Sequence, residues 1–211
     1  MEHWTEYSRF LVALFVILDP FAAVPIFLVL SKAYTPAERG GIANITAITV
    51  LAVLIAASLA GETLLHGMGT SLASFRVGGG IVLLLMALAM LQAQPDRLRS
   101  TPAEEAEAAD RQSIAVVPLA IPLLAGPGSI STVIIEMHRS SAEYHGLLVV
   151  LCITIVSFVL WLVLRMAGNI GKILGQTGLN IITRLFGLVL AAIAIEIMAN
   201  GLIELFPTLA R

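Results

Sequence analysis

The feature that most constrains this chain is a series of long segments without Asp, Glu, Lys, Arg or His. Four of these segments are uninterrupted, and two are interrupted once, by Asp19 and by Glu196. In chain order they are residues 10–30, 42–60, 77–93, 114–135, 146–164 and 185–203. A helix needs roughly 17–25 residues to cross about 30 Å of hydrocarbon, and it satisfies its own backbone hydrogen bonds there. The sequence therefore predicts an all-α membrane protein with six transmembrane helices.

The composition excludes several other classes of protein. Hydrophobic residues make up 58% of the 211 residues and charged residues 12%, whereas soluble domains have about 25% charged residues. A net charge of −2 leaves no basic surface for nucleic acid. Cys152 is the single cysteine, all four histidines lie outside the apolar segments, and there is no phosphate-binding loop. We therefore expect no disulfide within the chain, no metal site, no cofactor and no enzymatic activity.

The positive charges predict an orientation in the membrane. The segment before the first apolar stretch carries Glu2 and Glu6 against Arg9, which is unlike a signal peptide, so we expect the first helix to be retained. Eight of the twelve Lys and Arg residues fall on one predicted side of the membrane and four on the other. The positive-inside rule places the richer side in the cytoplasm and both termini in the periplasm of a bacterial inner membrane.

The two halves of the chain resemble each other at an offset of 107 to 108 residues. Asp19-Pro20 aligns with Gly126-Pro127, and Arg76 aligns with Arg184. The first repeat is residues 1–93, the second is residues 114–211, and residues 94–113 form a polar cytoplasmic linker. Each repeat has three predicted spans, so the second copy must insert upside down. Inverted repeats are typical of secondary transporters, although a duplication without a transport role would leave the same pattern.

The first helix of each repeat carries residues that interrupt helices. Pro20 and Pro25 follow Asp19, and Gly126, Pro127 and Gly128 interrupt the equivalent helix before Ser129 and Ser131. A helix that restarts at this point directs free N–H groups at a cavity, where they suit an anion. Two structural roles stay open. Asp19 could cap its own broken helix, and the hydroxyls could bond back to their own helix.

The last predicted helix carries Glu196 and Asn200, which are four residues apart and therefore share a face. An acid in the middle of a span is costly and is commonly functional. We expect both side chains to contact a solute, and a hydrogen bond between helices is the alternative. Glu62, Arg76 and Arg184 lie at helix ends. We expect structural or gating roles for these three residues and for Pro25.

These motifs resemble the MarC family of bacterial integral membrane proteins. The resemblance covers nearly the whole chain and rests mainly on the two motifs at residues 19–28 and 121–130, with supporting matches at 61–63, 75–84 and 183–188. It implies six spans in an inner membrane, and some members are described as neutral amino acid transporters. Ala22 and Ala23 stand where the family motif commonly has Gly-Asn, which bears on selectivity.

Together these observations predict a secondary transporter or exporter of small solutes, with neutral amino acids as the favoured class. The site is expected near the midplane, between the two broken helices. A zwitterion suits an anion site at Gly128–Ser129 that faces an acid at Asp19 or Glu196. Expected partners are the bilayer, the solute and a proton or sodium ion, and a homo-oligomer stays open. The alternative function is a membrane scaffold or assembly protein that transports nothing.

Overall fold

The computed structural model describes residues 2–32, 34–67, 69–92, 115–140 and 143–210, and in this part of the chain it is helical without strands. The helices are α1 (Glu2–Leu18), α2 (Pro20–Leu30), α3 (Pro36–Gly67), α4 (Leu72–Gln92), the π-helix η1 (Ala115–Leu124), α7 (Pro127–Met137), α8 (His145–Arg165), α9 (Ala167–Leu205) and the short η2 (Pro207–Ala210). The predicted cytoplasmic linker at residues 94–113 lies outside the described residues.

Five helical segments of the described chain are long and apolar enough to cross a membrane. They are Thr5–Leu30, Pro36–Gly61, Leu72–Gln92, His145–Arg165 and Ala167–Leu205. Each contains most or all of one predicted apolar segment, so the prediction of an all-α membrane protein is confirmed. The apolar side chains that remain exposed on α8 and α9, such as Leu147, Phe158 and Leu188, fit a surface in contact with lipid tails.

The fourth predicted segment, residues 114–135, differs from the other five. It consists of η1, with 10 residues, followed by α7, with 11 residues. Neither helix is long enough to cross a bilayer alone. The amide of Ala125 bonds the carbonyl of Ala120, five residues earlier, at 2.8 Å, in a stretch where Pro118 and Pro122 have no N–H to donate. The arrangement of six spans in two inverted repeats stays a prediction at this point.

The chain changes direction locally at Asp19 and at Gly126. Asp19 has φ 42° and ψ 70°, in the left-handed region, and its Oδ1 accepts the amide of Ala22 at 3.2 Å. Gly126 is extended, and Pro127 opens α7 just as Pro20 opens α2. Proline suits the first helical position because its missing N–H has no helical partner there. The α1–α2 segment therefore has a capped interruption at the buried Asp19.

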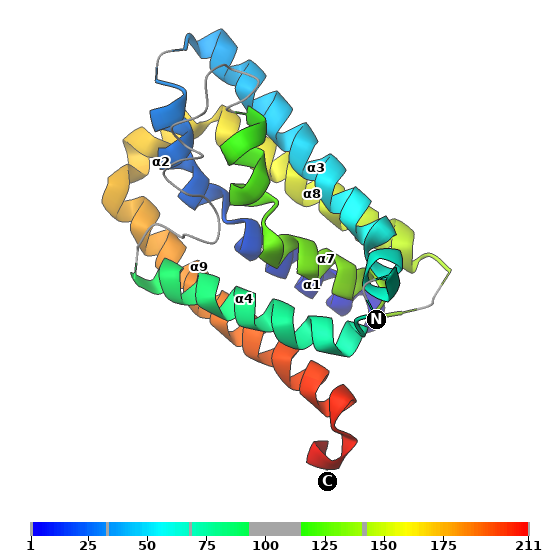
Figure 1. Ribbon diagram of the computed structural model, residues 1–211. Helices are drawn as coiled ribbons and strands as arrows, with labels where there is room; N and C mark the ends of the chain where they lie inside the picture. The colour runs from blue at the N-terminus through cyan, green and yellow to red at the C-terminus, as the bar shows by residue number, and fades with distance from the viewer. Residues whose placement is uncertain (1, 33, 68, 93–114, 141–142, 211) are drawn as a thin grey trace.

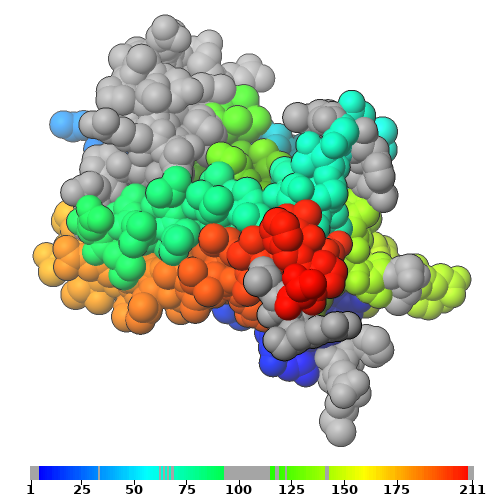
Figure 2. Space-filling view, turned by 60° about the horizontal axis from the view of Figure 1, so that its bottom comes forward, coloured from blue at the N-terminus to red at the C-terminus, as the bar shows by residue number. Residues whose placement is uncertain are grey.

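The helices form two long pairs with the interrupted segments between them. Helices α3 and α8 lie side by side along one edge, and α4 and α9 along the other, with α1, α2, η1 and α7 between the pairs (Figure 1). Figure 2 shows α4 and α9 running beside each other across one face of the molecule. Helix α9 is longer than the predicted span at 185–203, and it bends at Gly175, where φ is 59°.

Glycines set the close approach of α4 to α9. A Cβ on Gly80 would overlap the Cγ of Met198 and lie 3.0 Å from the carbonyl oxygen of Ala194. A Cβ on Gly187 would lie 3.0 Å from the carbonyl oxygen of Ala87. Small residues let membrane helices pack backbone against backbone, where dispersion contacts are densest.

Candidate functional site: a polar cavity at one end of the helices

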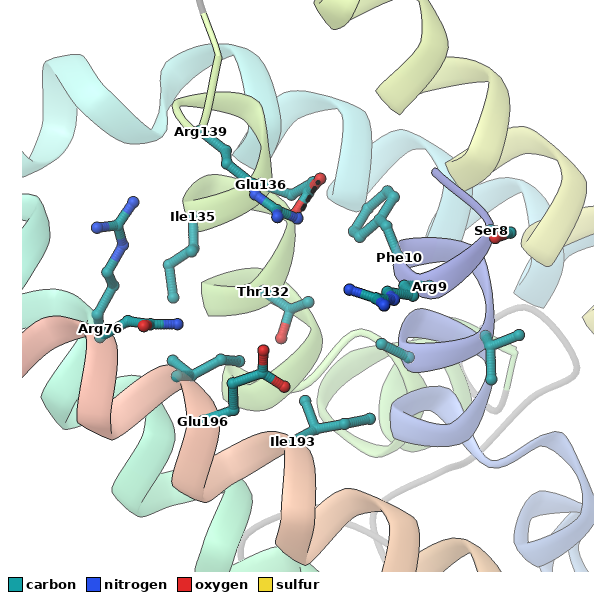
Figure 3. A pocket seen from close by; sticks show the side chains of 14 residues that line it. Ser8, Arg9, Phe10, Arg76, Thr132, Ile135, Glu136, Arg139, Ile193 and Glu196 are labelled. Atoms are coloured by element: carbon teal, nitrogen blue, oxygen red, sulfur yellow. Dashed lines mark ion pairs between the residues drawn. The ribbon is translucent and has the colours of Figure 1, made fainter. Parts of the chain in front are cut away.

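A cavity of about 720 Å³ lies between α1, α4, α7 and α9. The side chains that line it are shown in Figure 3. They are Ser8, Arg9, Phe10, Val12, Ala13, Arg76, Thr132, Ile135, Glu136, Arg139, Ile193, Glu196, Ile197 and Asn200. Several can ionise, although the segments they belong to are mostly apolar. Because ionisable side chains from separate helices converge on it, we take this cavity as the candidate functional site.

Helical periodicity explains why these residues meet. The residues from α9 lie at positions 193, 196, 197 and 200, and those from α7 and its C-terminal end at 132, 135, 136 and 139. Steps of three and four residues place side chains on one face of a helix. The cavity is therefore a junction of single faces from well-separated parts of the sequence.

Ion pairs tie the helix ends around this cavity. Arg76 at the start of α4 pairs with Glu204 at the end of α9. Arg139, just after α7, approaches Glu136 at 3.6 Å and Glu6 of α1 at 3.5 Å. The Arg139–Glu6 pair, with both side chains 45% exposed, stabilises little by itself. Together these ion pairs show that the start of α1, the start of α4, the end of α7 and the end of α9 lie at the same end of the molecule.

Two of the predicted solute-binding residues line the cavity. They are Glu196 and Asn200, and Arg76, which was predicted to be structural or gating, lines it as well. Figure 3 shows the Glu196 carboxylate and the Arg9 guanidinium both directed into the cavity, from α9 and α1. Neither makes an ion pair with another residue whose side chain is described.

The predicted residues at the start of α7 lie elsewhere. The hydroxyl of Ser129 donates to the carbonyls of Leu124 and Gly126 at 3.0 Å, and that of Ser131 donates to Gly128 at 3.0 Å. These hydroxyls bond back to their own segment, which is the alternative that the sequence left open.

Gly128 itself is covered by α4. A Cβ on Gly128 would lie 2.7 Å from Sδ of Met86 and 2.8 Å from Cδ2 of Leu83. Gly126 is likewise buried, Pro127 is exposed, and neither lines the cavity. The start of α7 is therefore packed against a neighbouring helix, away from the cavity.

The other predicted residues are also separate from the cavity. Asp19 and Pro20 are buried at the junction of α1 and α2, where Asp19 caps α2. Pro25 lies inside α2, and Arg184 is exposed on α9. The side chain of Glu62 is outside the described part of the structure.

Sequence reasoning missed Arg9, Thr132, Glu136 and Arg139. Arg9 and Arg139 are two of the four basic residues that charge counting places on the periplasmic side, and the count by itself gives them no role in a site. The spacing 132, 135, 136 and 139 was a usable signal, because it places a hydroxyl and two opposite charges on one face of a helix. What the spacing could not reveal is that α1 and α9 supply the facing walls.

A buried histidine joins three helices beside the cavity. His145, at the start of α8, is 4% exposed. Its Nε2 lies 2.7 Å from the carbonyl oxygen of Glu136 and its Nδ1 lies 2.8 Å from the hydroxyl of Tyr7 on α1. Because the carbonyl can only accept, Nε2 carries a hydrogen. In the neutral ring Nδ1 then accepts from the Tyr7 hydroxyl.

Loss of this hydroxyl should destabilise the protein. We expect Tyr7→Phe to lower the free energy of unfolding by about 1–3 kcal/mol, because it leaves a buried ring nitrogen without its donor. Tyr144→Phe is the matched control, because Tyr144 is 66% exposed, and it should stay within about 0.5 kcal/mol of wild type. Equal thermal stability of the two variants in detergent would contradict this role for Tyr7.

Comparison with known sequences identifies the family of this membrane protein. The model of the family described as "MarC family integral membrane protein" matches residues 4–206. The chain belongs to the MarC family. The match covers all four helices that line the cavity.

Relatives of this MarC family chain come from both archaea and bacteria. It is 40% identical over 191 residues to a UPF0056 membrane protein of Methanocaldococcus jannaschii, covering 90% of this chain and 92% of the relative. It is 36% identical over 206 residues to the UPF0056 membrane protein YhcE of Escherichia coli, covering 96% and 94%. It is 35% identical over 199 residues to YvbG of Bacillus subtilis, covering 94% of each chain. No solved structure matches this MarC family member.

Proposed function

We propose that this chain is a secondary transporter or exporter of small solutes, with neutral amino acids as the solute class. The observation that carries the proposal is the cavity of about 720 Å³, which places Arg9 and Glu196, without an ion pair among the described side chains, between membrane-spanning helices. We place the solute site in this cavity, at one end of the helices, and no longer at the midplane between the two interrupted helices. We assign no chemical reaction to it. The names of the relatives describe membrane proteins and give no substrate.

We further propose that the two halves are inverted repeats and that η1 and α7 together form the sixth span. Adding 107 to the bounds of α2, Pro20–Leu30, gives the bounds of α7, Pro127–Met137. Both helices begin with proline after an interruption. Helix α2 contacts α9, and α7 contacts α4. If α2 is equivalent to α7 and α4 is equivalent to α9, each of these contacts is the repeat-related copy of the other.

The crossing of α4 and α9 supports the same symmetry. Gly80 meets the carbonyl oxygen of Ala194, and Gly187 meets that of Ala87. Adding 107 to 80 and 87 gives 187 and 194, so each contact is the repeat-related copy of the other. A two-fold relation between antiparallel helices would produce this pattern, and it is the relation expected of inverted repeats.

We also propose an orientation of the protein in the membrane and an energy source for transport. With both termini in the periplasm of a bacterial inner membrane, the cavity opens outward, because its walls come from the same end of the molecule as the N-terminus. A proton or sodium gradient, or the solute gradient itself, would drive transport. Moving one charge through 100 mV supplies about 2.3 kcal/mol, which corresponds to roughly 50-fold accumulation.

Counterflow in liposomes tests this function. We expect purified protein to exchange labelled alanine or glycine across the membrane, and Ala13→Trp to lower the rate at least about ten-fold, because Ala13 lines the cavity and the indole would fill it. Ala52→Trp is the matched control, since Ala52 is exposed on α3, and it should exchange like wild type. Folded wild-type protein that exchanges no amino acid would favour the scaffold function instead.

A further inference from the structure

The charges in the cavity fall into two groups. Arg76 and Arg139 are neutralised by Glu204 and by Glu136 with Glu6. Arg9 and Glu196 make no such pair with the residues whose side chains are described, and they enter the cavity from facing walls (Figure 3). Within the described structure, the cavity therefore offers one cation on α1 and one anion on α9 that have no ion-pair partner.

From this pairing pattern we infer that Arg9 binds the carboxylate of an α-amino acid and that Glu196 binds its ammonium group. The inference rests on the proposed function. It assigns the carboxylate site to Arg9, whereas the sequence predicted this site at the start of α7. A guanidinium presents a planar set of N–H donors that matches a carboxylate. A carboxylate such as Glu196 has only acceptors when ionised, which suits an ammonium with three donors.

Thr132 strengthens the assignment of the ammonium end. Its hydroxyl donates to the carbonyl of Gly128 at 2.8 Å, so its hydrogen is used and only lone pairs remain for a ligand. Figure 3 shows Thr132 directed toward Glu196. The two side chains together form an acceptor-rich corner, which favours a donor such as ammonium over a second carboxylate.

The remaining walls indicate the third feature of the ligand. Phe10, Val12, Ile135, Ile193 and Ile197 give the cavity apolar surface, and the other lining charges already have ion-pair partners. A solute with one carboxylate, one ammonium and an uncharged side chain matches this set. A side chain with its own charge would enter without a counter-ion, at a desolvation cost.

A lipid headgroup that carries an anion and a primary ammonium shares part of this chemistry. Phosphatidylethanolamine is the simplest example. We assign the cavity to the free amino acid, because Arg9 and Glu196 enter one cavity from facing walls (Figure 3), which suits a ligand that carries one group of each charge. The experiment is therefore run in phosphatidylcholine vesicles, with and without added phosphatidylethanolamine.

Two measurements test the roles of Arg9 and Glu196, namely binding of labelled L-alanine to purified protein and counterflow in vesicles. Competitors are alaninamide, which lacks the carboxylate, and propionate, which lacks the ammonium. For wild type, alanine should compete at least about ten-fold better than either analogue, since each lost charge-assisted bond is worth about that factor.

The variants should separate the two ends of the solute. Arg9→Gln should remove the advantage of alanine over alaninamide, with alaninamide binding unchanged, and Arg9→Lys should keep part of it. Glu196→Gln should remove the advantage of alanine over propionate. Lys172→Gln, at an exposed position of α9 outside the cavity, should leave both ratios as in wild type.

The outcomes distinguish this inference from the proposed function. Arg9→Gln with wild-type ratios, or with equal loss for alanine and alaninamide, would overturn the role of Arg9. Competition by phosphatidylethanolamine against alanine would assign the two charges to a lipid instead. Alanine binding with the predicted ratios but without counterflow would overturn transport while supporting the inference. Wild-type protein that binds no alanine would overturn the inference.

Discussion

Gly80→Leu is expected to abolish the folded state of the detergent-solubilised protein or to destabilise it by roughly 4 kcal/mol or more. Any Cβ on Gly80 overlaps Met198 and crowds the carbonyl of Ala194. The neighbouring atoms include helix backbone, which cannot move aside as a flexible side chain can. Helices α4 and α9, which share the most extensive helix–helix contact of the described structure, would have to separate, so the loss should be large.

The matched control lies two residues away on the same helix. A Cβ on Gly78 has no atom within 4 Å, so Gly78→Leu makes the same chemical change where space is open. We expect Gly78→Leu to give a monodisperse peak in size-exclusion chromatography, with a melting temperature near that of wild type, and Gly80→Leu to aggregate or melt far lower. Similar behaviour of the two variants would contradict the close α4–α9 packing.

Gly187 provides a second test of the same contact. Because Gly187 occupies the repeat-related position, Gly187→Leu should match Gly80→Leu in the size of its effect. A large effect at Gly80 with none at Gly187 would argue against the two-fold relation between the halves, even if the packing at Gly80 itself is correct.

Asp19→Val is expected to lower the free energy of unfolding by about 2–4 kcal/mol, which is less than the effect of Gly80→Leu. Two terms contribute. Losing the cap on α2 costs about 0.5–2 kcal/mol, and placing a β-branched residue at φ 42° costs of order 1–3 kcal/mol. Thermal unfolding in detergent, followed by circular dichroism, measures the sum.

Asp19→Asn is the matched control, because asparagine tolerates the left-handed conformation and can also cap a helix. We expect Asp19→Asn to fold and to exchange solute much as wild type does, since Asp19 does not line the cavity. A folded Asp19→Asn protein without exchange would return Asp19 to the solute path, as the sequence suggested. Comparable stability of the Val and Asn variants would contradict the capping geometry.

Much of the helical fold was predictable because its causes are local. Apolar segments such as residues 42–60 and 146–164 must be helical in lipid, since no water is present to satisfy their backbone. The helix starts at Pro20 and Pro127 follow from a residue that has no N–H. The four-residue spacing of Glu196 and Asn200 likewise places them on a shared helix face, because helical periodicity alone decides it.

The candidate site was only partly predictable, because it depends on which helix faces meet. Arg9 and Glu196 are far apart in the sequence, and nothing in either segment indicates that both side chains face the same cavity. From the sequence alone, the hydroxyls of Ser129 and Ser131 could bind either a ligand or their own backbone. In the structure they donate to backbone carbonyls, and Met86 and Leu83 pack against Gly128.

The sequence by itself determined the membrane class, the family and the positions of the helix starts, because hydrophobicity and proline chemistry act within one segment. Only the tertiary structure decided that the polar cavity lies at the end of the molecule where α1, α4, α7 and α9 meet, with Asp19 in a capping role away from it. The physical reason is that burial and charge pairing are properties of neighbours in space. A polar side chain becomes part of a site only when the packing of the helices leaves it facing a cavity.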